Sequence, residues 1–331
     1  MKTFAIVGAT GAVGIEALQV LEKRNFPLNN LRLFSSARSA GKVLKYKGAD
    51  VIVEELKEDS FKGVDMAIFS AGGDVSKKFA PMAAKDGCIV IDNSSAFRMD
   101  DSVPLVVPEI NPAALKGHKN IISNPNCTTI ITLMALYPLH QAFGVRRVFA
   151  SSYQAVSGTG AQAVTELERE VRQVVNNEPV TIEVYPKQIA FNVLPQVDVF
   201  LESGYTKEEM KMQNEGAKIM NHPSFKASVT CVRVPVYRAH AVAVSAEFDK
   251  SITPELAREA LAKAPGIKVV DDPANKIYPT PLEVSGKDDC EVGRIRTDCA
   301  FENGLSFWVV GDQLLKGAAL NAVQIAEHLI A

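Results

Sequence analysis

The chain has 331 residues, of which 47% are hydrophobic and 22% are charged, and its formal net charge is −2. This composition is ordinary for a globular protein, and the length is sufficient for two domains. A near-neutral chain has no strong basic field, so neither nucleic acid nor a membrane surface is an expected partner. No stretch approaches the ~18 apolar residues of a membrane span.

The cysteines indicate a reducing compartment and no structural metal. They are scattered, odd in number and without C-x-x-C spacing, which argues against a disulfide framework and against a zinc site. The first apolar run is only about five residues long before it meets a glycine, too short for a signal-peptide core. We therefore expect a cytoplasmic protein without a bound metal. The five cysteines are Cys88, Cys127, Cys231, Cys290 and Cys299.

In the first 125 residues, short apolar runs alternate with helical patterns. This rhythm predicts an α/β domain with a Rossmann-type parallel sheet and helices on both faces. The predicted strands are 3–7, 31–34, 65–70 and 87–92, and the predicted helices are 12–23 and 79–85.

The pattern changes after about residue 130, where longer strands have fewer helices between them. This arrangement predicts an α+β domain with a mixed or antiparallel sheet. We place the first domain at 1–128, completed by a C-terminal helix within 313–331, and the second domain at 129–312. The predicted helices here are 130–143, 162–175 and 313–329, and the predicted strands are 145–153, 229–236, 241–248 and 305–310.

A glycine-rich loop, GATGAVG at 8–14, follows the first strand and opens the first helix. Glycines allow a tight turn and a close approach of backbone N–H groups to a pyrophosphate, which the helix dipole also attracts. The alternative is an ordinary glycine-rich turn, but the strand–loop–helix context favours a dinucleotide site. The turn after the third strand is a further candidate contact. The candidate cofactor residues in these two turns are Gly8, Thr10, Gly11, Ala12, Val13, Ser70 and Gly72.

The end of the second strand predicts NADP rather than NAD. An NAD enzyme usually places an acidic residue there for the ribose hydroxyls. Here the segment 35–42 reads SSARSAGK and has no acid. Ser35 and Ser39 offer hydroxyls, and Arg38 offers a guanidinium that suits a 2′-phosphate. The alternative is a solvated basic loop.

Cys127 is the candidate nucleophile. It lies in SNPNCTT at 123–129, where turn residues precede it and a helical run follows it. A helix N-terminus stabilises a thiolate and offers N–H groups to an oxyanion. Cys88 and Cys231 lie in strand-like apolar runs and are interpreted as structural. A thiol beside a nicotinamide indicates oxidation of an aldehyde through a thioester, which water or phosphate then releases.

The whole chain resembles the aspartate-semialdehyde dehydrogenase family. The resemblance implies the reversible, NADP-dependent, phosphorylating oxidation of aspartate semialdehyde to aspartyl phosphate. It also implies a homodimer that works reductively in the biosynthesis of lysine, diaminopimelate, threonine and methionine. The segments that carry it are GATGAVG at 8–14, SNPNCTT at 123–129, SYQAVSGTG at 152–160, IAFNVLPQ at 189–196, RVPVYRAH at 233–240 and GDQLLKGAA at 311–319.

The resemblance also implies roles for individual residues. Cys127 matches the nucleophile, Gln154 the residue that orients the substrate, and His240 the acid/base. Arg233 matches the clamp for the substrate carboxylate. The further implied phosphate or substrate ligands are Arg98, Asn126, Glu208 and Lys211, and the further implied cofactor contacts are Ser157, Gly158 and Gln313.

The spacing of these residues along the chain bears on two of the implied roles. His240 lies seven residues after Arg233, so a continuous strand would place the two on opposite faces. Both reach one substrate only if the strand breaks near 237–239. Glu208 and Lys211 share a helical face, and without the resemblance they would be read as a surface ion pair worth ~0–1 kcal/mol. Spacing favours Glu208 over Glu209.

The sequence leaves two other functions open. N-acetyl-glutamyl-phosphate reductase shares the fold and the thioester chemistry, but that family typically carries an HRH-type segment where this chain reads IAFNVLPQ. A non-catalytic NADP-binding paralogue is the second alternative. The joint presence of Cys127, Gln154, Arg233 and His240 argues against it. A glyceraldehyde-phosphate dehydrogenase shares the phosphorylating logic but has no support from the motifs.

Overall fold

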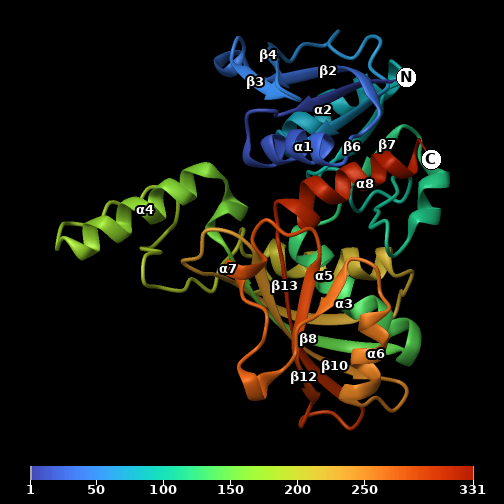
Figure 1. The fold of residues 1–331 in the computed structure, drawn as a ribbon, viewed down its shortest axis with the longest axis vertical. Helices are drawn as coiled ribbons and strands as arrows, with labels where there is room; N and C mark the ends of the chain where they lie inside the picture. The colour runs from blue at the N-terminus through green and yellow to red at the C-terminus, as the bar shows by residue number, and fades with distance from the viewer. Residues whose placement is uncertain (1, 331) are drawn as a thin grey trace. The chain divides into compact units, whose positions relative to one another are not determined.

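The computed structural model describes residues 2–330, which form two compact units (Figure 1). Unit 1 contains the described residues up to Asn126 together with those from Ala318 onward, and unit 2 is Cys127–Gly317. The chain leaves unit 1 at the residue before Cys127 and returns to it for its last helix. Each unit has its own sheet and its own core.

Unit 1 is built on a seven-stranded sheet in the order β3-β4-β2-β1-β5-β6-β7. All neighbouring strands are parallel except the β3–β4 hairpin at one edge. The strands are β1 (Lys2–Val7), β2 (Leu28–Ser35), β3 (Val43–Tyr46), β4 (Ala49–Glu55), β5 (Met66–Phe69), β6 (Ile89–Asp92) and β7 (Ile121–Ser123). The helices are α1 (Ala12–Lys23), α2 (Gly73–Lys85) and α8 (Leu320–His328), with short 3-10 turns at Ala37–Ser39 and Pro112–Gly117.

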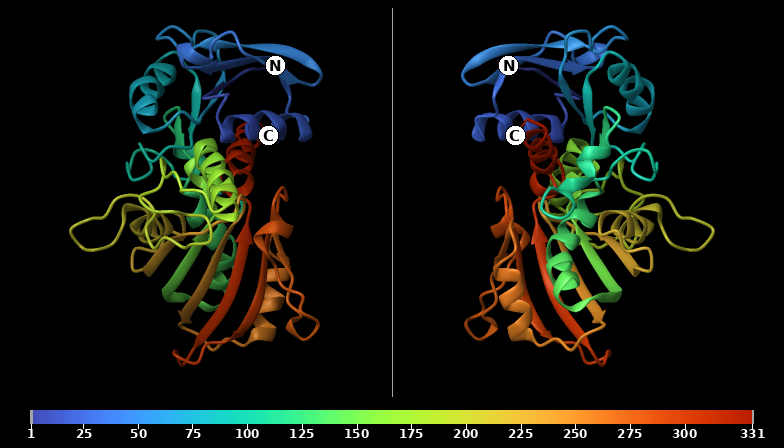
Figure 2. Two further views of the ribbon diagram at one scale, coloured as in Figure 1. Left: turned by 90° about the vertical axis from the view of Figure 1, so that its left-hand side faces the viewer. Right: turned by 90° about the vertical axis from the view of Figure 1, so that its right-hand side faces the viewer.

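The buried parts of the central strands of unit 1 are largely apolar, as expected for a parallel sheet covered by helices. Phe4 to Val7 on β1 and Met66 to Phe69 on β5 are completely buried. Helix α8 packs against α1, as Figures 1 and 2 show, and Arg24 forms a bidentate ion pair with Glu327 across that contact. The parallel order brings the carboxyl ends of β1, β2, β5 and β6 to one edge, where ligands bind in such sheets.

Unit 2 contains a mixed six-stranded sheet in the order β11-β12-β13-β10-β8-β9. The strands are β8 (Val145–Gln154), β9 (Lys226–Arg233), β10 (His240–Phe248), β11 (Ile267–Val269), β12 (Cys290–Thr297) and β13 (Gly304–Gly311). The helices are α3 (Cys127–Phe143), α4 (Ala161–Val175), α5 (Lys207–Ile219), α6 (Pro254–Ala262) and α7 (Pro281–Val284), with 3-10 turns at Val156–Thr159 and Pro273–Asn275.

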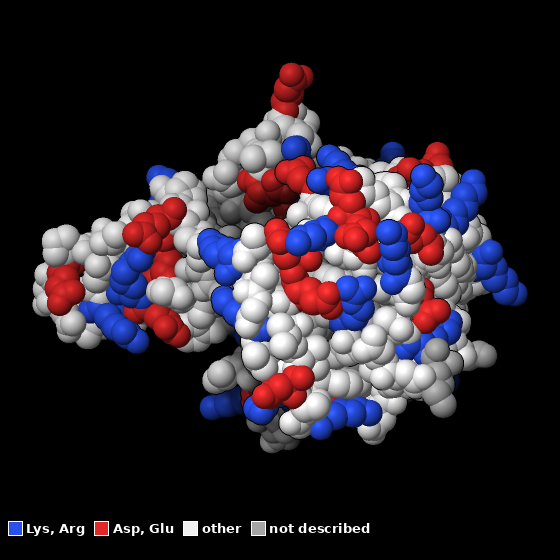
Figure 3. Space-filling view, turned by 90° about the horizontal axis from the view of Figure 1, so that it is seen from above, with Lys and Arg blue, Asp and Glu red and all other residues white. Residues whose placement is uncertain are grey.

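Helix α3 contacts α5 and α6, and all three helices contact strands of the sheet, which gives the sheet a covered face. Residues of β8 alternate accordingly, with Val148, Ala150 and Ser152 buried. On the opposite face, Phe149 is 51% exposed and Tyr153 is 37% exposed. Helix α4 extends away from the sheet (Figure 1). The face of the molecule seen in Figure 3 mixes both signs of charge.

The predicted fold class is confirmed, and each predicted strand or helix overlaps an observed one. The C-terminal helix is a correction, because its regular α-helical part begins at Leu320 instead of residue 313. Asp312 accepts hydrogen bonds from the N–H groups of Leu314 and Leu315, so residues 313 and 314 form a turn. A short π-helical turn then follows at Leu315–Ala319, before the α-helix begins. The edge hairpin β3–β4 was not predicted, because exposed, lysine-containing strands have a weak apolar signal.

Within residues 2–330, no helix is both long enough and apolar enough to span a membrane. The same described residues contain no cluster of three or more His, Cys, Asp or Glu side chains arranged to hold a metal ion.

Candidate active site

The glycine loop of unit 1 makes a tight turn that only glycine permits. Gly8 has a φ of +84°, and a Cβ placed on it would lie 2.7 Å from the carbonyl oxygen of Ser70. A Cβ on Gly14 would lie 2.3 Å from the carbonyl oxygen of Gly8. Gly11 precedes α1, so Ala12 and Val13 present the first N–H groups of that helix. The loop therefore has the form that a pyrophosphate requires.

A cavity of about 450 Å³ lies beside this loop. The predicted contacts Gly8, Thr10, Gly11, Ser35 and Ser70 line it, and the hydroxyls of Thr10 and Ser35 are 3.0 Å apart. Three apolar lining residues, which sequence reasoning did not single out, suit the flat face of a base. They are Leu56, Val75 and Phe79. Ala12, Val13, Arg38, Ser39 and Gly72 do not line the cavity itself.

Two further features of unit 1 fit a dinucleotide. Arg38 is exposed in the turn after β2 and forms no ion pair within the described residues, so its guanidinium is available to a phosphate. Ser39 beside it is buried. The amide of Asn93, just beyond β6, is buried and has no hydrogen-bond partner in residues 2–330. An unsatisfied buried amide usually has a ligand or a water as its partner.

Arg98 and Asn126, the predicted phosphate ligands, are both buried in unit 1. Arg98 donates from Nε to the carbonyl oxygen of Asn124 at 3.0 Å and from Nη2 to that of Asn93 at 2.7 Å. Asn124, which the sequence did not single out, also accepts a hydrogen bond from Asn321 at 2.6 Å. These contacts fix the segment that leads into Cys127.

Cys127 is the first residue of α3, as the Asn-Pro-Asn turn before it predicted. The helix behind it is buried on nearly all sides, and the N-terminal dipole favours a thiolate at this position. Gly317 is packed against the cysteine, because a Cβ placed there would lie 2.8 Å from the Cβ of Cys127. Cys88 and Cys231 are almost completely buried, and burial raises the pKa of each thiol to about 12. Both cysteines are buried, as the apolar runs around them predicted.

The register of the sheet in unit 2 brings Gln154, Arg233 and His240 to the covered face. Gln154 pairs with Arg233 across the parallel strands β8 and β9. Strand β9 ends at Arg233 and β10 begins at His240, on the other side of β8. The intervening loop includes Ala239 at a φ of +70°. The expected break between Arg233 and His240 is therefore confirmed, and both side chains approach Gly158 closely.

Glu208 reaches Gln154 and Glu209 does not. The Gln154 Nε2 donates to Glu208 Oε1 at 3.0 Å and also to the hydroxyl of Thr128, the residue after Cys127. Glu209 instead accepts from the backbone N–H groups of Thr206 and Cys231, a capping and anchoring role. The Gln154 Oε1 is buried without a partner among residues 2–330, so it is left for a ligand.

Lys211 lies one helical turn beyond Glu208 on α5. Its Nζ is 2.7 Å from Glu208 Oε2 and 3.3 Å from Asp198 Oδ2. Glu208 is only 8% exposed, so this is not an ordinary surface pair. Asp198, a position that sequence reasoning missed, helps to hold the ammonium next to the site.

His240 is 1% exposed and neutral over the physiological range. The pKa of its imidazole is lowered to about 3, chiefly by burial and also by the charge of Arg233, while Glu208 opposes the shift. The Nδ1 atom accepts a hydrogen bond from the Ala155 N–H at 3.1 Å. Arg233 binds the same residue, since its Nη1 donates to the Ala155 carbonyl oxygen at 2.7 Å.

Ser157 and Gln313 hold the loops of the site together. Gln313 Nε2 donates to the Ser157 hydroxyl at 2.6 Å, and its Oε1 accepts from the Ala239 N–H at 2.7 Å. The Ser157 hydroxyl in turn donates to the carbonyl oxygen of Tyr237. Because both ends of the Gln313 amide are engaged, the side chain links the segment at Ser157 to the residue before His240.

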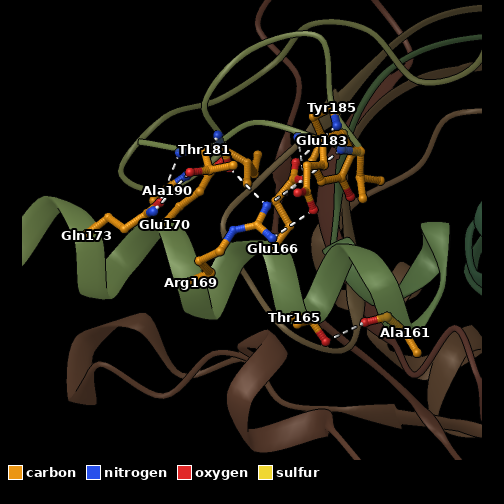
Figure 4. Close-up of polar contacts among 12 residues, drawn as sticks. Ala161, Thr165, Glu166, Arg169, Glu170, Gln173, Thr181, Glu183, Tyr185 and Ala190 are labelled. Atoms are coloured by element: carbon orange, nitrogen blue, oxygen red, sulfur yellow. Dashed lines mark hydrogen bonds and ion pairs between the residues drawn. The ribbon is translucent and has the colours of Figure 1, made fainter. Parts of the chain in front are cut away.

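Helix α4 holds a further loop, residues 183–190, through two buried carboxylates (Figure 4). Glu166 accepts hydrogen bonds from three successive N–H groups, those of residues 183–185, and Glu170 accepts from those of 189 and 190. This arrangement presents the Tyr185 hydroxyl to Thr159 at 3.0 Å. Sequence reasoning missed both glutamates, because charged helix residues usually face water.

The predicted site residues thus form two groups. The glycine loop, Arg98 and Asn126 belong to unit 1, and the cysteine, glutamine, histidine, arginine and Glu208–Lys211 pair gather in unit 2. Both units match family models. Residues 3–118 match the semialdehyde dehydrogenase NAD binding domain, and residues 136–316 match the semialdehyde dehydrogenase dimerisation domain. The fold and the site therefore define a semialdehyde dehydrogenase.

Relatives narrow this class. Aspartate-semialdehyde dehydrogenase of Aquifex aeolicus is 54% identical over 98% of this chain and 97% of its own length, and that of Bacillus subtilis is 50% identical over 98% and 96%. A crystal structure of aspartate semialdehyde dehydrogenase II from Vibrio cholerae, complexed with ASA, superposes with a TM-score of 0.97 at 45% identity, covering 100% of this chain and 98% of that one. The chain belongs to the aspartate-semialdehyde dehydrogenase family.

These comparisons support the interpretation of the chain as an NADP-dependent oxidoreductase over the two alternatives. A Candida albicans enzyme crystallised with NADP shares the fold, with a TM-score of 0.77 at 24% identity and coverage of 100% of this chain and 99% of that one.

Proposed function

We propose that the chain catalyses the reversible phosphorylating oxidation of L-aspartate 4-semialdehyde to L-4-aspartyl phosphate, and that it works reductively in amino-acid biosynthesis. The observation that carries this proposal is the set of side chains near Cys127 in unit 2. A nucleophile at a helix N-terminus has a buried amide, an arginine, a neutral histidine and a carboxylate–ammonium pair within one network. An α-amino acid with a reactive carbonyl offers a complementary group to each of them.

The charges of the substrate suggest which residue binds each of its groups. The Arg233 Nε–H is buried without a partner among residues 2–330, which suits the substrate carboxylate. The Glu208 carboxylate suits the substrate ammonium, and Lys211 suits inorganic phosphate. Arg98 and Asn126, as residues of unit 1, are proposed as further ligands of phosphate or of the acyl phosphate.

Cys127 provides the covalent chemistry in this proposal. Its thiolate adds to the aldehyde carbon, and the thiohemiacetal becomes a thioester when hydride leaves. The unit 1 cavity would hold NADP, whose nicotinamide would supply the acceptor for that hydride. Phosphate then attacks the thioester and frees the thiolate again. Gln154, which hydrogen-bonds the hydroxyl of the residue after Cys127, orients the reacting group.

NADP is favoured over NAD by the charge at the end of β2. Ser35, Arg38 and Ser39 supply hydroxyls and a cation there, and the segment has no carboxylate to repel a 2′-phosphate. The proposed contacts from unit 2 are Ser157, Gly158 and Gln313.

The chain is also proposed to form a homodimer in the cytoplasm. The uncovered face of the unit 2 sheet carries two aromatic pairs, Phe149 with Phe301 at 5.8 Å and Tyr153 with Trp308 at 5.3 Å between ring centroids. Exposed aromatic side chains on a sheet face favour a protein partner. The cysteines, all thiols, fit a reducing compartment. Sedimentation of the wild-type chain and of a Phe149→Glu variant tests the dimer.

The activity is tested by NADPH formation from aspartate semialdehyde with and without phosphate, with N-acetylglutamate semialdehyde alongside. We expect phosphate-dependent turnover of the first aldehyde only, and a loss of roughly 10⁴-fold or more in Cys127→Ala. Turnover of the acetylated aldehyde alone would assign the chain to the reductase instead. Bound NADP without any turnover would indicate a non-catalytic protein.

A further inference from the structure

The loop 183–190 belongs to no helix or strand of the described chain, yet helix α4 holds its backbone at both ends. Glu166 accepts hydrogen bonds from the N–H groups of residues 183–185, and Glu170 accepts from those of 189 and 190. Glu166 is 1% exposed and Glu170 is 0% exposed. Burial of a carboxylate is unfavourable unless hydrogen bonds replace the lost water. These N–H groups replace it, so the loop has one defined position on α4 (Figure 4).

The side chain of Tyr185 connects this loop to the 3-10 turn at Val156–Thr159. Its hydroxyl donates to the carbonyl oxygen of Val156 at 3.4 Å and lies 3.0 Å from the hydroxyl of Thr159. Its ring packs against an apolar cluster in which Val156 of the turn meets Ile189 of the loop and side chains of α4. The turn is therefore held against α4 by apolar packing and by the Tyr185 hydroxyl.

The same turn packs directly on the Arg233 guanidinium. A Cβ placed on Gly158 would lie 3.0 Å from Arg233 Nη1. Within residues 2–330, the guanidinium makes its only hydrogen bond with the Ala155 carbonyl oxygen, and its Nε–H has no partner. A single hydrogen bond orients a guanidinium less well than a bidentate pair does. Its orientation therefore depends on the turn that packs against it.

Two further observations place the loop and its continuation beside Arg233. Burial raises the pKa of the Tyr185 phenol, whereas its hydrogen bond with Thr159 and the charge of Arg233 oppose the rise. The backbone of Leu194, in the same apolar cluster, exchanges two hydrogen bonds with the backbone of Arg233, at 2.9 and 2.8 Å. The backbone of Arg233 and the turn beside its side chain are thus both attached to the structure that α4 supports.

We propose that Tyr185 is a positioning residue for Arg233. Helix α4 and the loop 183–190 hold its hydroxyl against the turn, and the turn keeps the guanidinium aligned with the substrate carboxylate. Contacts with that non-reacting carboxylate bind the ground state and the transition state alike, so their loss raises KM and leaves kcat nearly unchanged. The inference rests on the proposed function for the identity of the carboxylate that Arg233 binds.

Tyr185→Phe tests this role, because it removes the hydroxyl and keeps the ring in the apolar cluster. We expect the KM for aspartate semialdehyde to rise about 3- to 10-fold, the usual effect of one hydrogen bond, while kcat and the KM for phosphate change less than about 2-fold. 3-Aminopropanal is the same aldehyde without the carboxylate, so its kcat/KM should be equal in Tyr185→Phe and the wild type. An effect on both aldehydes, or on neither, would overturn the proposal.

Two matched variants sharpen the result. Tyr205→Phe removes a hydroxyl that lies 2.8 Å from Ser228, toward the other end of β9 from Arg233, and should leave the KM unchanged. Thr159→Val removes the partner of the Tyr185 hydroxyl. If the two hydroxyls act through one hydrogen bond, the double variant should raise the KM no further than Tyr185→Phe alone. Additive rises in KM would contradict the shared role.

Hydrogen exchange gives a readout that needs no turnover. The N–H groups of residues 156–158 are hydrogen-bonded, and they should exchange faster in Tyr185→Phe than in Tyr205→Phe, because the turn opens more often. Equal exchange in the two variants would overturn the positioning role whatever the substrate is. If the exchange differs as expected but the wild type does not turn over aspartate semialdehyde, the proposed function fails and the positioning of the turn stands.

Discussion

Arg233 and His240 bind opposite ends of one residue: Arg233 donates to the carbonyl oxygen of Ala155, and His240 accepts from its N–H. Ala155 directly follows Gln154, so a single stretch of backbone sets the positions of three side chains of the site. Movement of this stretch would displace all three together. The site therefore behaves as one unit, and its single substitutions should be non-additive.

Removal of the Gln154 amide should affect both activity and stability. In Gln154→Leu, Glu208 loses a buried hydrogen bond, which costs about 1–3 kcal/mol of unfolding free energy. We expect kcat/KM for the aldehyde to fall roughly 10²-fold, because the group that orients the substrate is lost. Steady-state kinetics and urea denaturation measure the two effects. The exposed Gln141→Leu is the control, and equal behaviour of the two variants would contradict the assignment.

Lys211 should control the affinity for phosphate. Lys211→Met removes the ammonium that Glu208 and Asp198 hold in place. We expect the KM for phosphate to rise about 10-fold, the loss of one charge-assisted hydrogen bond, with a smaller change in the KM for NADP. Initial rates at varied phosphate measure this effect. Lys207→Met on the exposed side of α5 should leave the KM for phosphate unchanged.

Arg38 should decide between the two nicotinamide cofactors. In Arg38→Ala the KM for NADP should rise about 10-fold or more while that for NAD changes little, because only NADP carries the 2′-phosphate. Rates with the two cofactors in parallel measure the ratio. Lys62→Ala, which removes another exposed cation of unit 1, should keep the wild-type preference. A parallel loss for NAD would show that the guanidinium binds elsewhere.

Gly14→Ala should destabilise unit 1. The new Cβ would lie 2.3 Å from the Gly8 carbonyl oxygen and 2.8 Å from the Ala9 Cα, and backbone atoms cannot rotate away. The expected cost is about 3 kcal/mol or more, which lowers Tm by roughly 6–12 °C. Gly117→Ala meets nothing within 4 Å, so calorimetry should show little change for it. A Tm unchanged by Gly14→Ala would contradict the close packing of the loop.

The buried imidazole of His240 should make the free energy of unfolding depend on pH. Its pKa is lowered from 6.5 to about 3 in the folded protein, chiefly by burial. The unfolded chain therefore binds the proton first, and stability present above pH 6.5 is lost as the pH falls toward the folded value. The slope is up to ~1.4 kcal/mol per pH unit.

Urea denaturation from about pH 7 down to about pH 4.5 measures this loss. His240→Gln should show a shallower fall over that range, because it lacks the group that titrates. Burial also lowers the pKa of His140, but that residue is present in both proteins and does not contribute to the difference. His328→Gln, at an exposed position near the end of α8, should fall as steeply as the wild type. Identical slopes for wild type and His240→Gln would show that His240 is not buried in its neutral form.

The local features of this protein could be predicted from its amino-acid sequence. Apolar periodicity and glycine positions predicted the strand–loop–helix around Gly8, because that geometry depends on residues close together in the chain. The turn residues before Cys127 predicted a helix N-terminus there in the same way. The lack of an acidic residue at 35–42, after β2, could be read directly from the sequence and predicted NADP over NAD.

Which side chains meet in the site could be seen only in the folded structure. Strand register put Gln154 beside Arg233 and brought His240 to the same face, and no local pattern encodes a pairing between residues that far apart. The distinction between Glu208 and Glu209 likewise depended on which carboxylate the backbone of β9 already occupies. Burial and the charge of Arg233 lower the pKa of His240, and both depend on neighbours that folding alone brings within reach.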